Sequence, residues 1–401
     1  MIPEGWQVRK QGEIAEFSNG RAYKLTEWEK EGTPVIRLQN LTGSGKDYYF
    51  SNLKLPERQY CEYGDLLYMW SATFGPYIWK GERAIYHYHI WKVTCDEMNL
   101  TKLFLYHLLG YQTSSWMGIS NGMGILHVTK GNMEDMNLLL PPLPEQEKIA
   151  AILTSVDGAI EKQEAQIDKL QSLKKAMMQE LLAKGIGHTE FKDSPVGKIP
   201  KGWEVVHVSD IGKVKGGKRM PKGRAFSDRQ TKHPYIRVTD FSNGTVSLLD
   251  LKYVHPEDRE KIKRYIISKD DLYVSIAGSI GLVGTIPAIL DGAQLTENAA
   301  KVVLDRATEK NFLKYLLQSD LCQNQFLQEI GTGGGVPKLA LFRIEKTIIP
   351  LPLLSEQQQI AAILTSVDGN IESKQQKLAH TKSLKKSLMQ DLLTGKVRVN
   401  V

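Results

Sequence analysis

Apolar residues recur in two long segments of this chain with the spacing of a helix that packs along a second helix. Within residues 145–182 and 356–393 they fall into two interleaved seven-residue phases, which together form one apolar seam. The seam residues are Ile149, Leu153, Val156, Ile160, Ile167 and Leu170 in the first segment, and Ile360, Leu364, Val367, Ile371, Leu378 and Leu388 in the second. Polar residues interrupt the phases at Gln163, Lys174, Lys374, Thr381 and Lys385. The pattern predicts two long helices.

The two helical segments are copies of each other. EQEKIAAILTSVDGAIE at 145–161 returns as EQQQIAAILTSVDGNIE at 356–372, about 211 residues later. Pro144 and Ser355 suit helix starts, and Gly185 and Gly395 suit helix ends. Two equal helices can present two equal surfaces, or they can pack on each other with pseudo-two-fold symmetry.

The segments outside the helices repeat more loosely. Ile-Pro-x-Gly-Trp begins at residue 2 and again at residue 199, and each segment ends with an apolar strand that runs into proline. Strands are expected at Val35–Leu38, Leu66–Trp70, His89–Val93, Ile236–Thr239, Leu272–Ile276 and Lys301–Leu304, and helices at Thr101–Leu109 and Glu309–Gln318. The expected fold class is α+β. The expected domains are residues 1–144 and 189–354, which are globular, and residues 145–188 and 355–401, which carry the long helices.

Composition describes an ordinary globular chain that is long for one core. Its 401 residues suggest two to three domains, and no apolar run approaches the roughly 18 residues that a membrane helix needs. Cys61, Cys95 and Cys322 form no pair with metal-binding or redox spacing, and the beginning of the chain carries no signal-peptide core. These features predict a protein of the reducing cytoplasm.

The positive charge is unevenly distributed. Residues 1–144 hold 14 Lys and Arg against 15 Asp and Glu, whereas residues 189–354 hold 25 against 19. The second globular segment therefore has the charge that a nucleic-acid partner would favour, and the first does not.

Two loops are candidates for ligand contact. Residues 213–219 read Lys-Val-Lys-Gly-Gly-Lys-Arg, and cations beside glycines can approach a phosphate backbone closely. DNA contact is favoured there over a merely solvated loop. Residues 70–77 mix aromatic and hydroxyl side chains, and their counterpart, residues 276–281, differs strongly. Such a difference suits two readers of different bases, but Trp70 and Phe74 could equally be core residues.

Motifs for catalysis and for metal binding are missing from the sequence. The glycines at 331–335 lack the Lys-Ser/Thr of a phosphate-binding loop. His87 and His89 have no third ligand at a recognisable spacing, so a packed or surface pair is favoured over a metal site. We therefore expect no catalytic residue and no metal ligand in this chain.

Four motifs together resemble the DNA-specificity subunit of type I restriction-modification systems. They are Pro-Leu-Pro-Glu-Gln-x-x-Ile at 142–149, Leu-Lys-Lys-x-x-Met-Gln-x-Leu-Leu at 173–182, Lys-Gly-Ile-Gly-His at 184–188, and Ile-Pro-x-Gly-Trp at both domain starts. The similarity covers essentially the whole chain and includes the order of its parts.

The resemblance implies two target-recognition domains, each reading one half of a bipartite site in double-stranded DNA. The long helices would pair as an antiparallel coiled coil that sets the gap and docks the modification subunits. Two modification subunits would carry S-adenosylmethionine, and two restriction subunits would use ATP and Mg. No cofactor is expected on this chain, and no membrane partner.

The residues predicted to contact DNA are loop groups chosen by position. They are Arg21, Lys24, Asn40, Ser71, Phe74 and Tyr77 in the first domain, and Lys215, Lys218, Arg219, Arg224, Ser279 and Thr332 in the second. Arg37 and Arg237 recur at matched positions, and they can instead be structural ion-pair partners. The alternative function is a coiled-coil assembly scaffold that reads no DNA sequence. A self-contained nuclease or methyltransferase has no motif in its favour.

Overall fold

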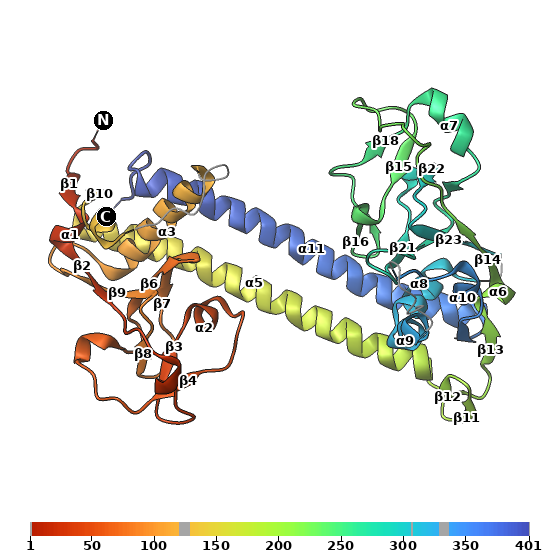
Figure 1. Cartoon of the computed structure of the whole chain (residues 1–401), viewed down its shortest axis with the longest axis horizontal. Coiled ribbons are helices and arrows are strands. Elements are labelled where there is room, and N and C mark those ends of the chain that lie inside the picture. The colour runs from red at the N-terminus through yellow and green to blue at the C-terminus, as the bar shows by residue number, and fades with distance from the viewer. Residues whose placement is uncertain (1, 120–128, 306–307, 329–336, 401) are drawn as a thin grey trace. The chain divides into compact units, whose positions relative to one another are not determined.

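The computed structural model describes residues 2–119, 129–305, 308–328 and 337–400. The chain divides into two compact units, and each unit contains one globular domain together with parts of both long helices (Figure 1). Unit 1 consists of Met1–Ala165 and Gln375–Val401, and unit 2 consists of Gln166–Lys374.

Unit 1 contains two four-stranded sheets. The first has the strand order β2-β9-β6-β7, with β2 at Ala15–Asn19, β9 at Ile90–Cys95, β6 at Leu66–Ser71 and β7 at Thr73–Ile78. The second has the order β4-β3-β8-β5, with β4 at Tyr49–Ser51, β3 at Thr33–Ile36, β8 at Ala84–Tyr86 and β5 at Tyr60–Cys61. Strand β1 (Gln7–Lys10) pairs with β10 (Asn137–Leu140). The helices are α1 (Gln11–Ile14), α2 (Leu38–Thr42), α3 (Lys102–Ile119) and α4 (Lys130–Glu134), with 3-10 turns at Leu25–Glu27 and Glu57–Gln59.

Unit 2 repeats this plan. Its sheets have the orders β14-β23-β20-β21 (Gly212–Gly216, Ala299–Leu304, Leu272–Ser275, Val283–Thr285) and β18-β15-β22-β19 (Lys252–Tyr253, Pro234–Ile236, Ala293–Leu295, Ile266–Ile267). Strand β13 (Glu204–His207) pairs with β24 (Ile348–Leu351). Two hairpins have no counterpart in the described part of unit 1: β11 (Phe191–Ser194) with β12 (Gly197–Pro200), and β16 (Phe241–Ser242) with β17 (Thr245–Val246). The helices are α6 (Val208–Ile211), α7 (Pro256–Ile262), α8 (Lys310–Gln318), α9 (Asp320–Gln328) and α10 (Leu341–Glu345), with 3-10 turns at Val238–Asp240 and Ala288–Leu290.

The four-stranded sheets of the two domains match strand for strand. In each, the central pair of the second sheet is parallel, β3 with β8 and β15 with β22, while the first sheet is antiparallel throughout. The predicted α+β class and the internal repeat are therefore confirmed.

Some local predictions were wrong. The strand expected at Ile236–Thr239 ends at Ile236, and a 3-10 turn follows at Val238–Asp240. Residues 70–77 do not form a loop, because β6 and β7 make a tight hairpin in which Trp70 pairs with Phe74 and Ser71 with Thr73. Ala72 turns the chain with a left-handed φ of 58°. The glycine and proline at 75 and 76 read as loop signals, yet both lie within a paired strand.

The long helices are α5 (Leu143–Lys184) and α11 (Leu354–Leu393). Both begin slightly earlier than predicted, and α5 ends at Lys184, before the predicted limit of its segment at residue 188. Gly185 and Gly395 follow the two helices with left-handed φ angles of 67° and 70°, so glycine ends both helices as expected.

Polar pairs between the helices explain the interruptions of the seam in unit 1. Gln163 Nε2 donates to Thr381 Oγ1 at 3.2 Å, and Lys385 lies 2.5 Å from Asp157. The register is antiparallel, because partners further along α5 lie earlier on α11 (Figure 1).

The same relation holds within unit 2. Lys174 forms an ion pair with Asp368 at 2.6 Å, and Lys374 Nζ donates to Gln166 Oε1 at 3.0 Å. Lys174 and Asp368 are the repeat counterparts of Lys385 and Asp157, so one ion pair occurs twice. Every residue of the two predicted seams is buried or half-buried. Polar groups at isolated seam positions fix the register of paired helices.

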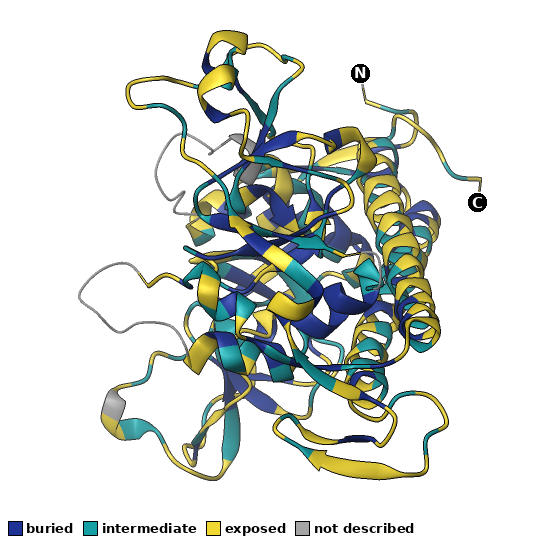
Figure 2. Ribbon diagram, turned by 90° about the vertical axis from the view of Figure 1, so that its right-hand side faces the viewer, coloured by how far each residue is buried: buried dark blue, intermediate teal, exposed yellow. Residues whose placement is uncertain are grey.

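Each domain core includes residues of both long helices. In unit 1, Ile149 and Leu153 of α5 join Leu392 and Leu393 of α11 in one cluster with the first sheet and α3. In unit 2, Ile360 and Leu364 of α11 join Leu182 of α5. In Figure 2 the long helices carry exposed residues interspersed with buried and half-buried ones. Among the described residues, no helix is long and apolar enough to cross a membrane.

We expect Ile371→Asp to destabilise unit 2. Ile371 is 9% exposed, and an unpaired carboxylate there should cost on the order of 2 kcal/mol or more. Thermal unfolding followed by circular dichroism should show a lower midpoint, and assembly should fail in light scattering. Ala379→Asp, at an exposed position of α11, is the control and should change neither. An unchanged midpoint and normal assembly of the Ile371 variant would rule out the packed seam.

Candidate nucleic-acid interface

Several loops of the first domain meet where parallel strands β3 and β8 end. The chain leaving β2 reaches Arg21, whose N–H donates to Tyr86 O at 3.1 Å and whose carbonyl accepts from Tyr88 N–H at 3.0 Å. The N–H of His87 donates to Ile36 O at 2.9 Å, so the turn after β8 is tied to the end of β3. Trp70 N–H donates to His89 O at 3.2 Å, which adds the β6–β7 turn. We call Arg21, Arg37, residues 70–73 and residues 87–89 the first loop edge.

The second domain builds an equivalent edge in which three of these four bonds recur, while the Lys218 carbonyl accepts from the Tyr235 hydroxyl at 2.9 Å. Lys218 N–H donates to Leu295 O at 2.8 Å, Thr296 N–H to Ile236 O at 3.1 Å, and Ile276 N–H to Asn298 O at 2.8 Å. Lys218 therefore corresponds to Arg21, and residues 296–298 correspond to residues 87–89. The second loop edge consists of Lys218, Arg237, residues 276–281 and residues 296–298.

A glycine makes the close approach possible in both edges. A Cβ on Gly20 would lie 2.2 Å from Tyr86 O, and one on Gly217 would lie 2.1 Å from Thr296 O. Both glycines are thus required because the neighbouring backbone leaves no room for a side chain. For Gly217 this packing is a structural reason for the glycine, separate from the approach to phosphate that the sequence suggested.

Aromatic rings and arginines dominate the first loop edge. The Arg37 guanidinium lies 4.0 Å from the Tyr49 ring centre, and Arg21 lies 4.5 Å from that of Tyr23. Trp28 stacks between Tyr23 and Tyr49 at 4.6 Å from each. Stacked rings beside guanidinium groups suit contact with nucleotide bases and phosphates.

The histidines of this edge are neutral at physiological pH. Burial, followed by the neighbouring His89 and Arg37, lowers the pKa of His87 to about 4, and burial also lowers the pKa of His89. Their rings lie 5.1 Å apart, with Tyr88 beside both. The described residues contain no group of three or more His, Cys, Asp or Glu that could hold a metal. Neutral imidazoles at this edge can donate and accept hydrogen bonds.

Exposed lysines dominate the second domain near its loop edge. Lys213 and Lys215 flank buried Val214 on β14, so both point away from the core. They lie on a strand, not in the predicted loop. Glu16 and Ser18 hold the matching positions on β2, because the strand registers with β9 and β23 are equivalent. Part of the charge difference between the domains therefore lies at these two matched strand positions.

The structure places the predicted DNA-contact residues in different settings. Arg21, Ser71, Lys218 and Ser279 lie in the loop edges, and Arg219 lies directly beside one, with its guanidinium 2.6 Å from Glu297. Arg224 pairs with Asp258 and Glu257 of α7, and the Asn40 amide bonds Arg37 N, Gly45 O and Asp47 O within the α2 turn. Lys24 is exposed, Phe74 and Tyr77 lie on β7, Lys215 lies on β14, and Thr332 lies outside the described residues.

The turn residues 87–89 and 296–298 are not among the DNA contacts predicted from the sequence, which favours a packed or surface pair for His87 and His89. Arg237 pairs with Asp240 at 2.6 Å and Asp250 at 3.2 Å, in agreement with a structural role, whereas Arg37 stacks on Tyr49. The signal that could have found the turns is their position, immediately before the strands at 90 and 299 in both repeats.

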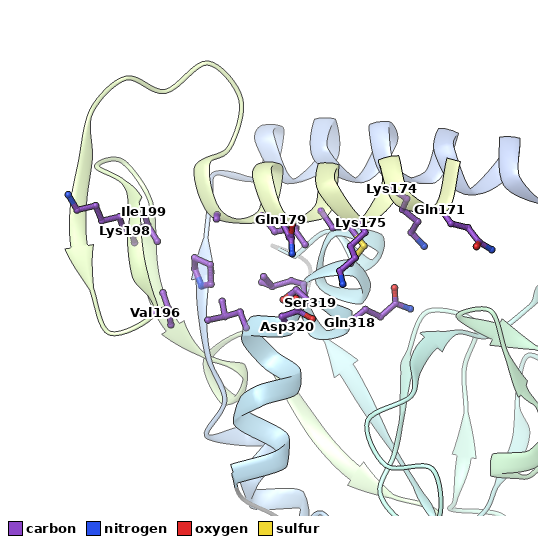
Figure 3. Close-up of a pocket in the computed structure, with 16 residues that line it drawn as sticks. Gln171, Lys174, Lys175, Gln179, Val196, Lys198, Ile199, Gln318, Ser319 and Asp320 are labelled. Atoms are coloured by element: carbon purple, nitrogen blue, oxygen red, sulfur yellow. Dashed lines mark hydrogen bonds between the residues drawn. The ribbon is translucent and has the colours of Figure 1, made fainter. Parts of the chain in front are cut away.

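A pair of matched grooves lies between the long helices and the domains. In unit 2 a groove of about 550 Å³ is lined by Lys174, Lys175 and Met178 of α5 and by Gln318 and Ser319 near the start of α9 (Figure 3). In unit 1 a groove of about 750 Å³ is lined by their repeat counterparts and by residues of α3. Those counterparts are Lys385, Lys386 and Met389 of α11. Both grooves thus present the same Leu-Lys-Lys-x-x-Met segment.

The sequence matches the model of the type I restriction modification DNA specificity domain twice, over residues 3–171 and 200–382. The MjaVIII specificity subunit of Methanocaldococcus jannaschii is 28% identical, over 99% of this chain and 94% of that protein. The EcoBI specificity subunit of Escherichia coli is 24% identical, over 99% of this chain and 86% of that protein. The crystal structure of the S subunit of a type I system from M. genitalium has the same fold, with a TM-score of 0.59 at 12% identity over 100% of this chain and 97% of that one.

We expect Lys218→Ala to weaken DNA binding by the assembled protein. If Lys218 contacts a phosphate, the slope of log K against log salt should fall by about one. Fluorescence anisotropy over a salt series measures it, and Lys192→Ala, at an exposed position of the β11–β12 hairpin, is the control with an unchanged slope. An identical slope for Lys218→Ala and the original chain would remove this side chain from the interface.

Proposed function

Because the chain belongs to the type I restriction-modification DNA specificity family, we propose that its two loop edges read the two halves of a split DNA site. The observation that carries this proposal is the contrast within the repeat. The backbone bonds that tie the strand ends together recur in both edges, while the side chains of the turns, His-Tyr-His at 87–89 and Thr-Glu-Asn at 296–298, differ at every position. One frame with two sets of side chains is what two different half-sites require.

The two domains would contact the DNA backbone differently. In the second domain, Lys213, Lys215 and Lys218 offer exposed charges for phosphates. The first domain offers Arg21 and Arg37 beside aromatic rings, with Glu16 where the second domain has lysine. We propose that its phosphate contacts are few and are supplemented by the modification subunits.

The long helices would act as spacer and as docking surface. A helix of 42 residues is about 63 Å long, which is of the scale needed to span half-sites about one DNA turn apart. We place the docking of two modification subunits at the two matched grooves, since equal surfaces suit equal partners. S-adenosylmethionine would be bound by those subunits, and ATP and Mg by two restriction subunits. The complex would work in the cytoplasm.

Methylation mapping tests the reading of DNA. Long-read sequencing of DNA from cells that carry this chain and its modification subunit should show one split adenine-methylated motif. Deletion of this chain should abolish it. Replacing residues 189–354 with the same segment of another specificity subunit should change one half-site only. Assembled protein that binds DNA without any sequence preference would favour the scaffold function instead.

Charge reversal in the grooves tests the docking. Lys175→Glu should remove one modification subunit from the complex, Lys386→Glu the other, and the double variant both, because each groove would bind one copy. Light scattering with mass analysis counts the bound subunits. Lys169→Glu, on an exposed position of α5 outside the groove, is the matched control. A double variant that still carries two modification subunits would place the docking elsewhere.

A further inference from the structure

The second loop edge holds a carboxylate among cations. Glu297 follows Thr296 at the end of β22, and its Oε1 accepts from Arg219 Nε at 2.6 Å. Lys338 Nζ lies 3.5 Å from the Glu297 carbonyl oxygen, and the Lys218 N–H is bonded to Leu295, two residues away. An anion in the most basic region of the chain would repel a DNA phosphate, so phosphate contact does not explain its presence.

The Glu297 carboxylate is held in one orientation and stays ionised. Oε1 is bonded to Arg219, and Oε2 accepts from Thr296 Oγ1 at 3.0 Å. Burial raises the pKa of Glu297, but the Arg219 guanidinium, the Glu297 backbone N–H and the Thr296 hydroxyl outweigh it, and the pKa is lowered overall. An ionised carboxylate is an acceptor only, and its roughly four lone-pair sites are not all used by these bonds, so it can accept from a further donor.

The side chain remains accessible to a ligand. Glu297 is 24% exposed, and Arg219 beside it is 78% exposed. Arg219 binds Glu297 through Nε, so this bond does not use the terminal nitrogens of the guanidinium. The pair therefore presents fixed acceptors next to a group of donors.

The first domain has a different residue at the position of Glu297, although the backbone of the turn closes in the same way. Tyr88 occupies the place of Glu297, between His87 and His89. The turn closes in the same way in both domains, by Ile90 N–H to His87 O at 2.9 Å and by Ala299 N–H to Thr296 O at 3.2 Å. Because the turn closes in the same way in both domains, the difference between Tyr88 and Glu297 is a difference in the side chain presented at the centre of the turn.

We infer that Glu297 is a specificity-determining residue of the second domain, which accepts a hydrogen bond from an exocyclic amino group of a base in the major groove, with Arg219 as its positioning residue. The donors of this kind are the N4 group of cytosine and the N6 group of adenine. This inference rests on the proposed reading of DNA by the second loop edge.

Methylation mapping with Glu297→Gln, in the full chain assembled with the modification subunit, tests the inference. The glutamine amide offers one acceptor and one donor group, so discrimination at one base pair should fall on the order of tenfold or more. The methylated motif should become degenerate at that position in one half-site. The other half-site and the gap should stay unchanged, and the degenerate position identifies the base as cytosine or adenine.

Two further variants separate base reading from a structural role. Glu260→Gln removes an exposed, ion-paired carboxylate of α7 in the same domain and should leave the motif intact. Arg219→Lys keeps a charge but loses the Nε–H that orients Glu297, and it should relax the same position less severely. Relaxation elsewhere in the motif would contradict the positioning role.

The outcomes distinguish this inference from the proposed function. If the original chain yields no split motif, the proposed function fails. If it yields one and Glu297→Gln leaves every position intact, only the role of Glu297 is overturned. A Glu297→Gln chain that unfolds at a lower temperature and loses binding to all sequences alike would also overturn it, because the residue would then be structural.

Discussion

Each unit depends on one glutamate at the start of a long helix, which is buried in unit 1 and half-buried in unit 2. Glu145 accepts from Trp6 Nε1 at 3.1 Å and forms an ion pair with Arg398 at 2.7 Å, so it joins the start of the domain, the start of α5 and the tail after α11. In unit 2, Glu356 accepts a hydrogen bond from Trp203 Nε1 at 2.9 Å, and its second carboxylate oxygen lies 2.9 Å from His188 Nε2. Each tail follows a glycine at the end of the opposite helix. The next residue along each long helix accepts a hydrogen bond from the backbone N–H just before a helix of the domain. Gln146 accepts from Thr101, before α3, and Gln357 accepts from Glu309, before α8. The recurring tryptophan and Glu-Gln motifs of the sequence are thus parts of one junction that fixes a domain on its helices within the unit.

The sequence revealed the long helices because their apolar periodicity is local and occurs twice. It could not explain Lys174 or Lys385, since their partners, Asp368 and Asp157, lie on the other helix and only antiparallel pairing brings them together. Helix α3 extends to Ile119, well beyond the predicted end at Leu109. Residues 112–115 read Gln-Thr-Ser-Ser, and this polar run interrupts the apolar pattern. Thr113, Ser114 and Ser115 donate their hydroxyls to carbonyls four residues earlier, so the helix satisfies these side chains internally, and an apolar pattern cannot detect that.

The loop edges were the hardest part of the candidate site to find. Arg21 and Lys218 were selected for their charge, and the structure gives them equivalent backbone bonds. Their relation to residues 87–89 and 296–298 arises from a parallel strand pairing between segments 50 residues apart in the first domain and 59 in the second, which no local pattern encodes. Asn40 and Arg224 were also predicted as DNA contacts, because they are polar or charged residues in expected loops. Their side chains bond neighbouring groups of their own domain, and such partners are visible only in three dimensions.

The repeat separates what the frame requires from what the edges can vary. Lys92 pairs with Asp65 at 2.9 Å, and Lys301 pairs with Asp271 at 2.9 Å, at the same register positions of the two first sheets. Removing one partner of such a shielded pair leaves a charge without compensation, which costs more than the pair itself contributes. These ion-paired positions of the first sheets therefore resist substitution. The turns 87–89 and 296–298, which connect the second sheet to β9 or β23, lie outside these ion pairs. Under the proposed reading of DNA, an edge whose backbone is fixed by a glycine and by strand ends would allow the target base to change through one turn, without disturbing the sheets that hold it.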